Sequence, residues 1–429
     1  MLFKLAYLNL FRNRRRTMST ALAISIGFVG LNLLGAYIYR VKKTLDTTSV
    51  YSALHGHVKI FKKDSLVNFS LQPKQYMLAN NEISQIKKII ETDFVDDVEY
   101  TGSNINGSGL LSNGGFSHPV LFYSFEPEVY ARSLTQPDIT NWAKDWILPS
   151  QLENVEVFKN NNEVISVTPR IADIMALKKP LKDNESLQLA GRTLDGDLNA
   201  VNVELGAEHT TGVQFLEDTL VLVPFKKVQE LLGTDGAESL SIYLQTKTNL
   251  HQFKKSFDLS LQKLNFRTDS YYYYDEKINS VYLGTIGFLV VMGVFFVFLI
   301  GTAVSLSIIN SLTMGIIERT REIGTLYAVG FKKIDVMRLF IIENFLLCLL
   351  SIAIGVLASS VIAGVVNSLN IRFTPPSVTG NIQFRLVWNF TIAFCVALFT
   401  LLLTFVSSWF VMKSKSKIKL IELLSDVGG

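Results

Sequence analysis

Four charged residues lie within five positions, between two of the most apolar segments of the chain: Glu318, Arg319, Arg321 and Glu322. On a helix, Glu318 with Arg321 and Arg319 with Glu322 would place opposite charges three residues apart, where they stabilise each other. Carboxylates and guanidinium groups can act in catalysis, bind a partner surface or remain solvated. The helical pattern alone favours docking and solvation equally.

The segment around these charges, residues 314 to 333, has the period of an amphipathic helix. One predicted face carries Ile316, Thr320, Ile323, Tyr327 and Phe331. The opposite face carries Glu318, Arg321, Glu322 and Thr325. Three glycines, Gly315, Gly324 and Gly330, permit close approach to another element, a break in the helix, or both.

The sequence contains none of the common nucleotide-binding or hydrolase motifs. It has no G-x-x-x-x-G-K-[ST] phosphate loop, no H-E-x-x-H zinc helix and no G-x-S-x-G nucleophile turn. We therefore expect no directly bound cofactor, and any ATP and magnesium to be held by a partner subunit. His55 and His57 would share one face of a strand and could ligate a metal, but no other ligand cluster is near, so ordinary polar histidines are favoured.

Four uncharged segments are long enough to cross a membrane as helices. They are Thr17 to Tyr39, Ile278 to Ile317, Asn344 to Ile371 and Leu386 to Met412. Each exceeds the roughly 20 residues that a membrane helix needs. Because none carries a charge, an ion path of the kind found in proton-driven transporters is disfavoured; Glu343, at the edge of the third segment, could reach water or pair with Arg338. The second segment is longer than one span, so we expect it to tilt or to project as a stalk.

The distribution of basic residues predicts the orientation of the chain. They gather before the first segment (Lys4, Arg12, Arg14, Arg15, Arg16), between the second and third (Arg319, Arg321, Lys332, Lys333, Arg338) and after the fourth (Lys413, Lys415, Lys417, Lys419). By the positive-inside rule these parts and both termini are cytoplasmic. Residues 42 to 275, with 23 basic and 30 acidic side chains, are then expected on the opposite side.

The first segment could also be a cleaved signal peptide, and its three arginines could belong to a twin-arginine signal. Its apolar run exceeds the usual signal core, so an uncleaved helix is favoured. Ser19, Ala23 and Gly27 recur every four residues, which suits close helix packing, although chance explains the spacing equally well. Residues 1 to 16 are expected to form a short interfacial helix.

The region from 42 to 275 mixes strand and helix patterns without a regular βαβ repeat. Strands are expected in "HGHVKIF", "NEVISV", "LNAVNVEL", "DTLVLVPF" and "LSIYLQT", and helices in "NEISQIKKIIETD" and "FKKVQELLG". The fold class is thus a membrane protein with four transmembrane helices and a large extracytoplasmic α+β domain.

Tyr271 to Tyr274 would lie at the membrane interface or at the base of this domain. Cys348 and Cys395 lie in predicted spans, where a buried apolar role is expected.

The segment "ERTREIGTLYAVGFKKIDVMRLFIIEN", residues 318 to 344, resembles a motif of the FtsX-like and MacB-like permeases of ABC transporters, which include the lipoprotein-releasing LolC and LolE type. The matching positions are Glu318, Arg319, Arg321, Glu322, Ile323, Gly324, Ala328, Gly330 and Glu343. Tyr327 departs from the pattern, since family members often have arginine there. "GHVKIF", "NGSGLLSNGG" and residues 195 to 233 are also similar, as is the Pro-rich "FTPPSVTG".

This resemblance implies a mechanotransmission-type permease. The matching residues from Glu318 to Gly330 would contact a cytoplasmic ABC ATPase, and a second permease copy or paralogue would complete the membrane part. A periplasmic carrier or adaptor and membrane lipid are further expected partners, and nucleic acid is not. The implied location is a bacterial inner membrane.

The resemblance also divides the chain into segments with separate roles. They are 1–16, interfacial helix; 17–41, first span; 42–275, MacB-like periplasmic domain; 276–313, stalk and second span; 314–335, cytoplasmic coupling segment; 336–371, third span; 372–385, periplasmic loop; 386–412, fourth span; and 413–429, cytoplasmic tail.

Within the family, cargo includes lipoproteins, lipids, macrolides, peptides and toxins, and we expect extraction or export of an amphipathic cargo without catalysis by this chain. Two alternatives stay open. In one, the permease transports nothing and regulates a periplasmic cell-wall hydrolase, as FtsX-like members do. In the other, it exports a drug, peptide or toxin with an adaptor, as MacB-like members do.

Overall fold

The computed structural model describes residues 3, 5–7, 14–153, 155–159, 161–177, 185–374 and 378–415. The chain divides into two compact units. The helical unit comprises Met1–Val41, Gly287–Ile371 and Phe384–Gly429, and the α/β unit comprises Lys42–Ile286 and Arg372–Gln383. The chain therefore passes between the units four times, and the first passage falls where the sequence predicts the end of the first span.

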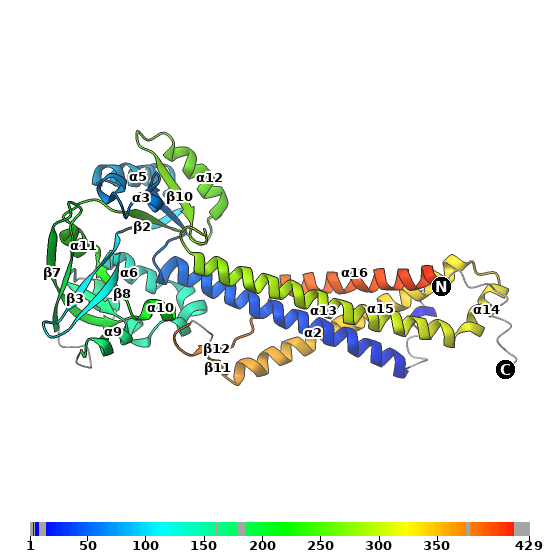
Figure 1. Cartoon of the computed structure of the whole chain (residues 1–429). Helices are drawn as coiled ribbons and strands as arrows, with labels where there is room; N and C mark the ends of the chain where they lie inside the picture. Colours follow the sequence, from blue (N-terminus) through cyan, green and yellow to red (C-terminus); the bar gives the residue numbers. More distant parts are fainter. Residues whose placement is uncertain are drawn as a thin grey trace. The chain divides into compact units, whose positions relative to one another are not determined.

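Four helices in the described part of the chain are long and apolar enough to cross a membrane. They are α2 (Arg14–Thr47), α13 (Ser280–Glu318), α15 (Lys333–Ser368) and α16 (Phe390–Lys415) (Figure 1). The second apolar segment is one helix of 39 residues, about 58 Å long. It extends five residues beyond the predicted bound at 313, and α15 begins three residues before the predicted bound at 336. The predicted coupling segment 314–335 therefore contains the last residues of α13 and the first residues of α15.

Within the helical unit, α2 and α13 run side by side (Figure 1). The Thr20 hydroxyl donates a hydrogen bond to the Ser311 hydroxyl at 2.6 Å. Gly27 is buried, and a Cβ atom there would collide with the Val304 side chain of α13. Of the predicted stripe, Gly27 thus lies in a close helix contact, Ala23 is half-buried and Ser19 is exposed.

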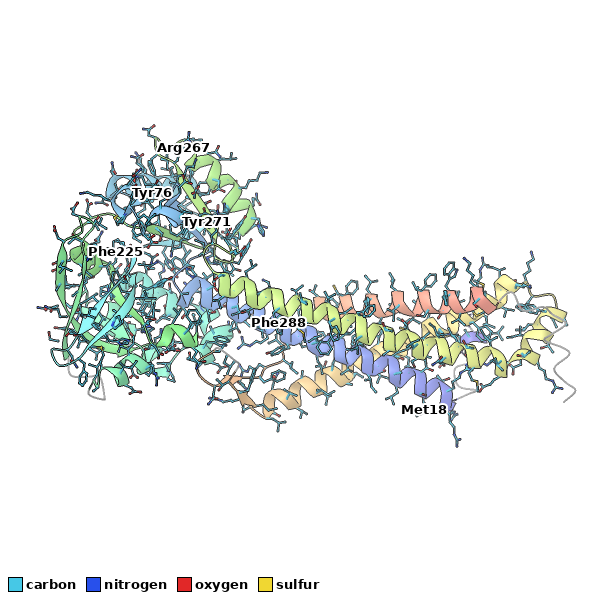
Figure 2. All side chains as sticks on the ribbon, viewed as in Figure 1. Met18, Tyr76, Phe225, Arg267, Tyr271 and Phe288 are labelled. Carbon is cyan, nitrogen blue, oxygen red and sulfur yellow. The ribbon has the colours of Figure 1, made fainter. Side chains whose placement is uncertain are left out.

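The outer surface of the helical unit is strongly apolar. Met18 of α2 is 69% exposed and Phe288 of α13 is 63% exposed, and both stand out from their helices in Figure 2. Exposed apolar side chains along helices of this length match what contact with lipid requires. Cys348 is buried, as expected, whereas Cys395 is exposed on α16, which corrects the expectation of burial for that thiol.

The α/β unit contains a four-stranded sheet in the order β10-β1-β9-β2. Its strands are β1 (Val58–Lys62), β2 (Val98–Asn104), β9 (Ser239–Leu244) and β10 (Thr268–Tyr272). All neighbouring pairs are antiparallel. The two central strands consist almost entirely of buried residues, as expected for strands covered on both faces.

The remaining long strands of the α/β unit close into a barrel in the order β3-β4-β8-β5-β7-β6. They are β3 (Asn106–Ser112), β4 (Ser117–Phe125), β5 (Val164–Val167), β6 (Glu185–Arg192), β7 (Leu198–Glu208) and β8 (Leu220–Pro224). Residues along β7 alternate between buried and more exposed positions, which is the pattern of a strand with one face inside a barrel.

Helices connect and cover these strands. The longer ones are α5 (Asn80–Asp93), α6 (Pro127–Leu134), α11 (Phe225–Leu232) and α12 (Leu250–Leu261). The shorter ones are η1 (Thr48–Ser52), α3 (Ser65–Asn68), α4 (Pro73–Tyr76), η2 (Ile139–Ala143), η3 (Lys144–Trp146), α7 (Pro149–Glu153), α8 (Val155–Lys159), α9 (Pro169–Ile174) and α10 (Gln214–Glu217).

The sequence patterns find part of this unit. Every predicted strand and both predicted helices exist, and α11 ends at Gly233 with φ +67°, a left-handed conformation that glycine adopts without strain. The patterns miss β2, β3, β4, β6 and β10. Of the tyrosine cluster, Tyr273 is buried in a core cluster of the α/β unit, which agrees with the base-of-domain alternative.

The segment between α15 and α16 belongs to the α/β unit. It forms a short antiparallel hairpin of β11 (Arg372–Phe373) and β12 (Ile382–Gln383). Pro375 and Pro376, which the sequence predicts to stiffen this loop, lie outside the described residues. So do Leu2 and Leu10 of the predicted interfacial helix and the part of the predicted tail after Lys415; Arg14 to Arg16 form the start of α2.

The core next to α5 and α12 contains three packed phenylalanines. The Phe257 ring is fully buried, lies 5.3 Å from Phe253 and 5.4 Å from Phe94 between ring centroids, and belongs to the largest apolar cluster of the α/β unit. Aromatic side chains in such a position contribute both apolar burial and ring contacts.

Replacing this ring should destabilise the α/β unit. We expect Phe257→Ala to lower the free energy of unfolding by about 3–5 kcal/mol, because it leaves a cavity. The matched control on the same helix is Leu259→Ala, since Leu259 is 58% exposed; it should change stability by less than about 0.5 kcal/mol. Thermal unfolding of the full chain in detergent measures both, and equal shifts would contradict the assigned core.

Candidate ATPase-docking site

The charged segment forms the end of α13 and a separate helix, α14 (Thr320–Ala328). Arg319 lies between them, with φ −104° and ψ 21°, outside helical geometry. Its carbonyl oxygen accepts the first bond of α14 from the Ile323 N–H at 2.9 Å. A single residue thus turns the chain from the long helix into the short one.

The Arg319 side chain points into the helical unit. Its Nη1 atom donates to Oε2 of Glu343 at 2.9 Å, and the side chains are 10% and 7% exposed. The other oxygen of Glu343, Oε1, lies 3.9 Å from Nη2 of Arg16 on α2. Arg16 also donates from Nη1 to Oε2 of Glu318 at 3.3 Å. One carboxylate therefore joins α2, the α13–α14 junction and α15.

Burial makes this arrangement sensitive to any change in its partners. A buried carboxylate is costly unless opposite charges and hydrogen bonds compensate it, and removal of one partner leaves the other charge unpaired. Gly315 contributes space: a Cβ atom there would collide with the Arg16 guanidinium. The glycine therefore allows α13 to pass close to this arginine.

The apolar face of α14 follows the predicted pattern. Ile323 is buried in a cluster with Ile316, and Tyr327 and Phe331 pack partly against it. Burial also raises the pKa of the Tyr327 hydroxyl. The helix is therefore held by apolar packing along one side and by the Arg319–Glu343 pair at its start.

The residues predicted for docking do not all lie on one accessible surface. Arg319 and Ile323 are buried, and Glu322 and Gly324 are half-buried. Those open to solvent are Glu318, Arg321, Ala328 and Gly330, next to Val329, which is 79% exposed. Gly330 has φ +103°, so it supplies the left-handed turn that ends this helix before α15. The accessible part of the predicted docking site is thus the exposed side and the C-terminal end of α14.

The two histidines considered as metal ligands lie in the turn before β1 and not on a strand. His57 Nδ1 accepts a hydrogen bond from the Leu244 N–H at 3.0 Å, and burial lowers its pKa to about 4. Burial likewise lowers the pKa of His55 to about 3. No group of three or more potential ligands is close enough to hold a metal ion in the described ranges, and the structure does not bring a ligand set around these rings.

A serine–histidine pair also occurs in the barrel. Ser166 Oγ lies 3.0 Å from His209 Nδ1, and Nε2 of this histidine has no hydrogen-bond partner. Both residues are buried, and burial lowers the pKa of His209 to about 3. A general base needs a pKa nearer neutrality and access to substrate. This pair is therefore part of the packed barrel.

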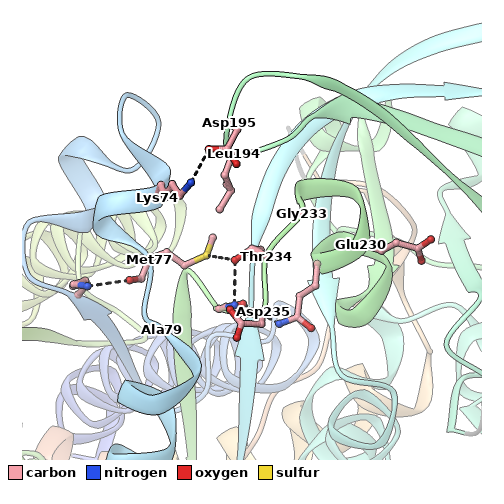
Figure 3. A pocket seen from close by; sticks show the side chains of 12 residues that line it. Lys74, Met77, Ala79, Leu194, Asp195, Glu230, Gly233, Thr234 and Asp235 are labelled. Carbon is pink, nitrogen blue, oxygen red and sulfur yellow. Dashed lines mark hydrogen bonds and ion pairs between the residues drawn. The ribbon is translucent and has the colours of Figure 1, made fainter.

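A cleft of about 720 Å³ lies in the α/β unit, between the α4–α5 region and the end of α11. Figure 3 shows the Lys74–Asp195 ion pair across it, at 2.7 Å, and the Thr234 hydroxyl near the Met77 sulfur. Both charged side chains are well exposed, with fractions of 70% and 64%. An exposed ion pair of this kind contributes little to the stability of the fold. The residues that line the cleft include no reactive side chain shielded from water.

Residues 277–420 match the model described as "FtsX-like permease C-terminal". The part of this chain from α13 to α16 thus resembles the FtsX-like permease family. The matched range begins just before α13 and includes α14, α15 and α16, so the match covers the elements that position Arg319 and Glu343.

Curated relatives of this permease have ABC transporter names. It is 22% identical over 380 residues to the ABC transporter permease YtrF of Bacillus subtilis, with 84% of this chain and 82% of the relative covered. It is 22% identical over 310 residues to the macrolide export ATP-binding/permease protein MacB of Mannheimia succiniciproducens, where the match covers 69% of this chain and 43% of the relative. The chain is thus an ABC transporter permease of the FtsX and MacB type.

A solved structure is also similar to part of this permease. The extracellular domain of the noncanonic ABC-type transporter YknZ from Gram-positive bacteria aligns over 50% of this chain and 98% of that chain, with 14% identity and a TM-score of 0.33.

The sequence did not predict that Glu343 of α15 would contact both α2 and the α13–α14 junction. It offered Glu343 either water or Arg338, whereas Glu343 is 5% exposed and contacts Arg319 and Arg16, and Arg338 lies 3.9 Å from Asp335. The available signal was a carboxylate at the very edge of an uncharged span, which needs a cationic partner. The sequence offers many arginines at that membrane face and does not choose among them.

Removing the carboxylate of Glu343 should loosen the attachment of α14. We expect Glu343→Ala to destabilise the helical unit by about 3–5 kcal/mol, since Arg319 keeps its buried charge without this partner. Asp335→Ala is the comparison variant, because its carboxylate is more exposed than that of Glu343 and has only a long contact to Arg338 and one capping bond from the Lys332 N–H. Thermal unfolding in detergent compares the two variants. A loss for Glu343→Ala no larger than for Asp335→Ala would refute the structural importance of the buried pair.

Proposed function

We propose that this chain is the permease subunit of a mechanotransmission-type ABC transporter. A separate cytoplasmic ATPase subunit hydrolyses ATP and docks on α14. The movement passes to the α/β unit, on the outer side of a bacterial inner membrane, and serves to extract or export a lipoprotein, a lipid or another amphipathic cargo. A second permease copy or paralogue and a periplasmic carrier complete the assembly.

The observation that carries this proposal is the geometry of α14. A short helix is held rigidly at its base by a buried ion pair and still presents exposed charged and apolar side chains, from Arg321 to Val329, at its surface. A solvated loop would need no such anchor. A surface that transmits force needs both an accessible contact and a firm attachment.

In this proposal, movement passes from the docking surface on α14 to the α/β unit along the covalent chain. Arg319 links α14 directly to α13, and α13 continues as one helix of 39 residues from the helical unit into the α/β unit. Within the α/β unit, Tyr282 near the start of α13 donates a hydrogen bond to Asp46 near the end of α2 at 2.6 Å, and Asn279 donates to the Ser49 hydroxyl at 2.9 Å. These hydrogen bonds join the chain at the end of α2 to the chain at the start of α13, within the α/β unit.

An efflux role is the second candidate, because one relative is named a macrolide exporter that carries its ATP-binding part in the same chain. A regulatory role without transport is a third. Release of labelled lipoprotein from proteoliposomes on ATP addition supports extraction. Cargo efflux that requires an added adaptor supports the second role, and ATP-dependent activation of a cell-wall hydrolase supports the third.

A charge exchange on α14 should disrupt docking without unfolding the helix. We expect Arg321→Glu with Glu322→Arg to reduce the stimulation of a copurified ATPase at least about 10-fold, equivalent to about 1.4 kcal/mol of lost contact energy. The control exchanges Glu156 and Lys159 on α8, an ion pair three residues apart with exposed side chains. Unchanged stimulation by the α14 variant would argue against docking at this surface.

The proposed orientation predicts opposite labelling of two exposed positions. Leu198 in the α/β unit is 85% exposed and Val329 after α14 is 79% exposed. With Cys395→Ser as background, Leu198→Cys should react with an impermeant thiol reagent in intact spheroplasts, and Val329→Cys should react only after lysis. The reverse pattern, or equal labelling, would refute the orientation.

A further inference from the structure

We propose that the Glu217 carboxylate fastens the loop between α15 and α16 to the barrel of the α/β unit. Through this contact, called the Glu217 clasp, α15 and α16 act on the barrel in addition to α2 and α13. The mechanical consequence rests on the proposed function, whereas the contact itself can be tested without any partner.

The clasp is a set of hydrogen bonds around one carboxylate oxygen. Oε1 of Glu217 accepts from Thr210 Oγ1 at 2.8 Å, from Thr211 Oγ1 at 2.7 Å and from the Thr211 N–H at 2.6 Å. It also accepts from Thr379 Oγ1 at 3.1 Å, and the Thr379 and Thr210 hydroxyl oxygens are 3.2 Å apart. Three donors come from the segment after β7, and the fourth comes from the loop between α15 and α16.

The barrel side of the clasp is firmly built. Glu217 is 6% exposed, and its carbonyl oxygen accepts a hydrogen bond from the buried Thr168 hydroxyl at 2.5 Å. The donors on Thr210 and Thr211 follow directly after β7. A buried carboxylate needs several donors to replace water, and here the barrel supplies most of them. Glutamate suits this position better than glutamine, because a carboxylate offers no N–H that could face the surrounding donors.

The loop side, by contrast, has little structure of its own. The β11–β12 hairpin has two residues in each strand, and the Thr374 hydroxyl donates to Asn381 Oδ1 at 2.8 Å within the loop. An isolated hairpin of this size is unstable in water. The bond from Thr379 to Glu217 gives the loop a side-chain attachment to the barrel, and β12 also contacts η3; both agree with the place of Arg372–Gln383 in the α/β unit.

The consequence is a second mechanical connection. The loop follows Ile371, where the helical unit stops, and precedes Phe384, where the helical unit begins again. If the loop is clasped, a displacement of α15 or α16 pulls on the barrel near β7 and α10. If it is not clasped, only α2 and α13 carry the movement.

Amide hydrogen exchange of the full chain in nanodiscs tests the clasp without any ATPase. We expect Thr379→Val, which keeps the side-chain shape and removes only the loop's donor, to speed exchange at residues 378–383 about 10-fold. Glu217→Gln should do the same. Thr211→Val is the matched control, because it removes a donor to the same oxygen from the barrel side. Unchanged exchange in the Thr379 variant would overturn the proposal.

Cross-linking supplies an independent test of the same geometry. With Cys395→Ser as background, Thr210→Cys with Thr379→Cys should form a disulfide under mild oxidation, detected as a linked peptide by mass spectrometry. Thr210→Cys with Ser117→Cys is the negative control, since Ser117 is exposed at the start of β4 and bonds to Ser112. Failure of the first pair to cross-link would also overturn the clasp.

The mechanical role is tested by rescue in the complex with its copurified ATPase. ATP should change amide exchange in the barrel of the wild-type chain, Glu217→Gln should reduce that change severalfold, and the oxidised Thr210–Thr379 cross-link should restore it in the Glu217→Gln chain. No restoration would overturn the role in force transmission. A wild-type chain without any ATP-dependent change would refute the proposed function and this mechanical role, while the partner-free results would still decide whether the clasp exists.

Discussion

The Glu343 carboxylate lies between two arginines that come from different helices. Arg319 approaches one oxygen from the junction of α13 and α14, and Arg16 approaches the other from the start of α2. Arg319 and Glu343 are buried and Arg16 is half-buried, so the buried pair in particular depends on both of its charges. The position of α14 depends on this contact, and through α14 so does any surface offered to a partner. The same contact explains why a charge sits at the edge of an otherwise uncharged span.

Two kinds of attachment recur in this permease. Apolar and glycine contacts bring helices close, as at Gly27 against Val304 and Gly315 against Arg16. Buried carboxylates then fix particular points: Glu343 at the docking helix and Glu217 at the loop between α15 and α16. A carboxylate with several donors specifies one arrangement. The proposed transmission of movement would use both the close packing and these fixed points.

Much of the helical unit follows from the sequence, because apolar length and amphipathic period are strong local signals. The four long helices and an amphipathic segment with a buried face at Ile316 and Ile323 are predictable in this way, although this segment is divided between the end of α13 and α14. The partners of Glu343 are not predictable, since they depend on how the helices pack: Arg319 lies 24 residues away along the chain, and Arg16 lies on α2, far away in the sequence. In the α/β unit, uniformly apolar strands such as β8 are found, while the Gly- and Ser-rich β2 and β3 carry weak strand signals. The Glu217 clasp depends on a contact between residues 162 positions apart, which no local pattern reports.

Site-specific photo-cross-linking from position 329 tests the central claim most directly. A photoreactive amino acid in place of Val329, which is 79% exposed at the end of α14, probes whatever touches this surface in cells. The account predicts an adduct with a cytoplasmic ATP-binding subunit, identified by mass spectrometry and weakened by the Arg321→Glu, Glu322→Arg exchange. Adducts only with lipid, or with a protein of the outer side of the membrane, would contradict it.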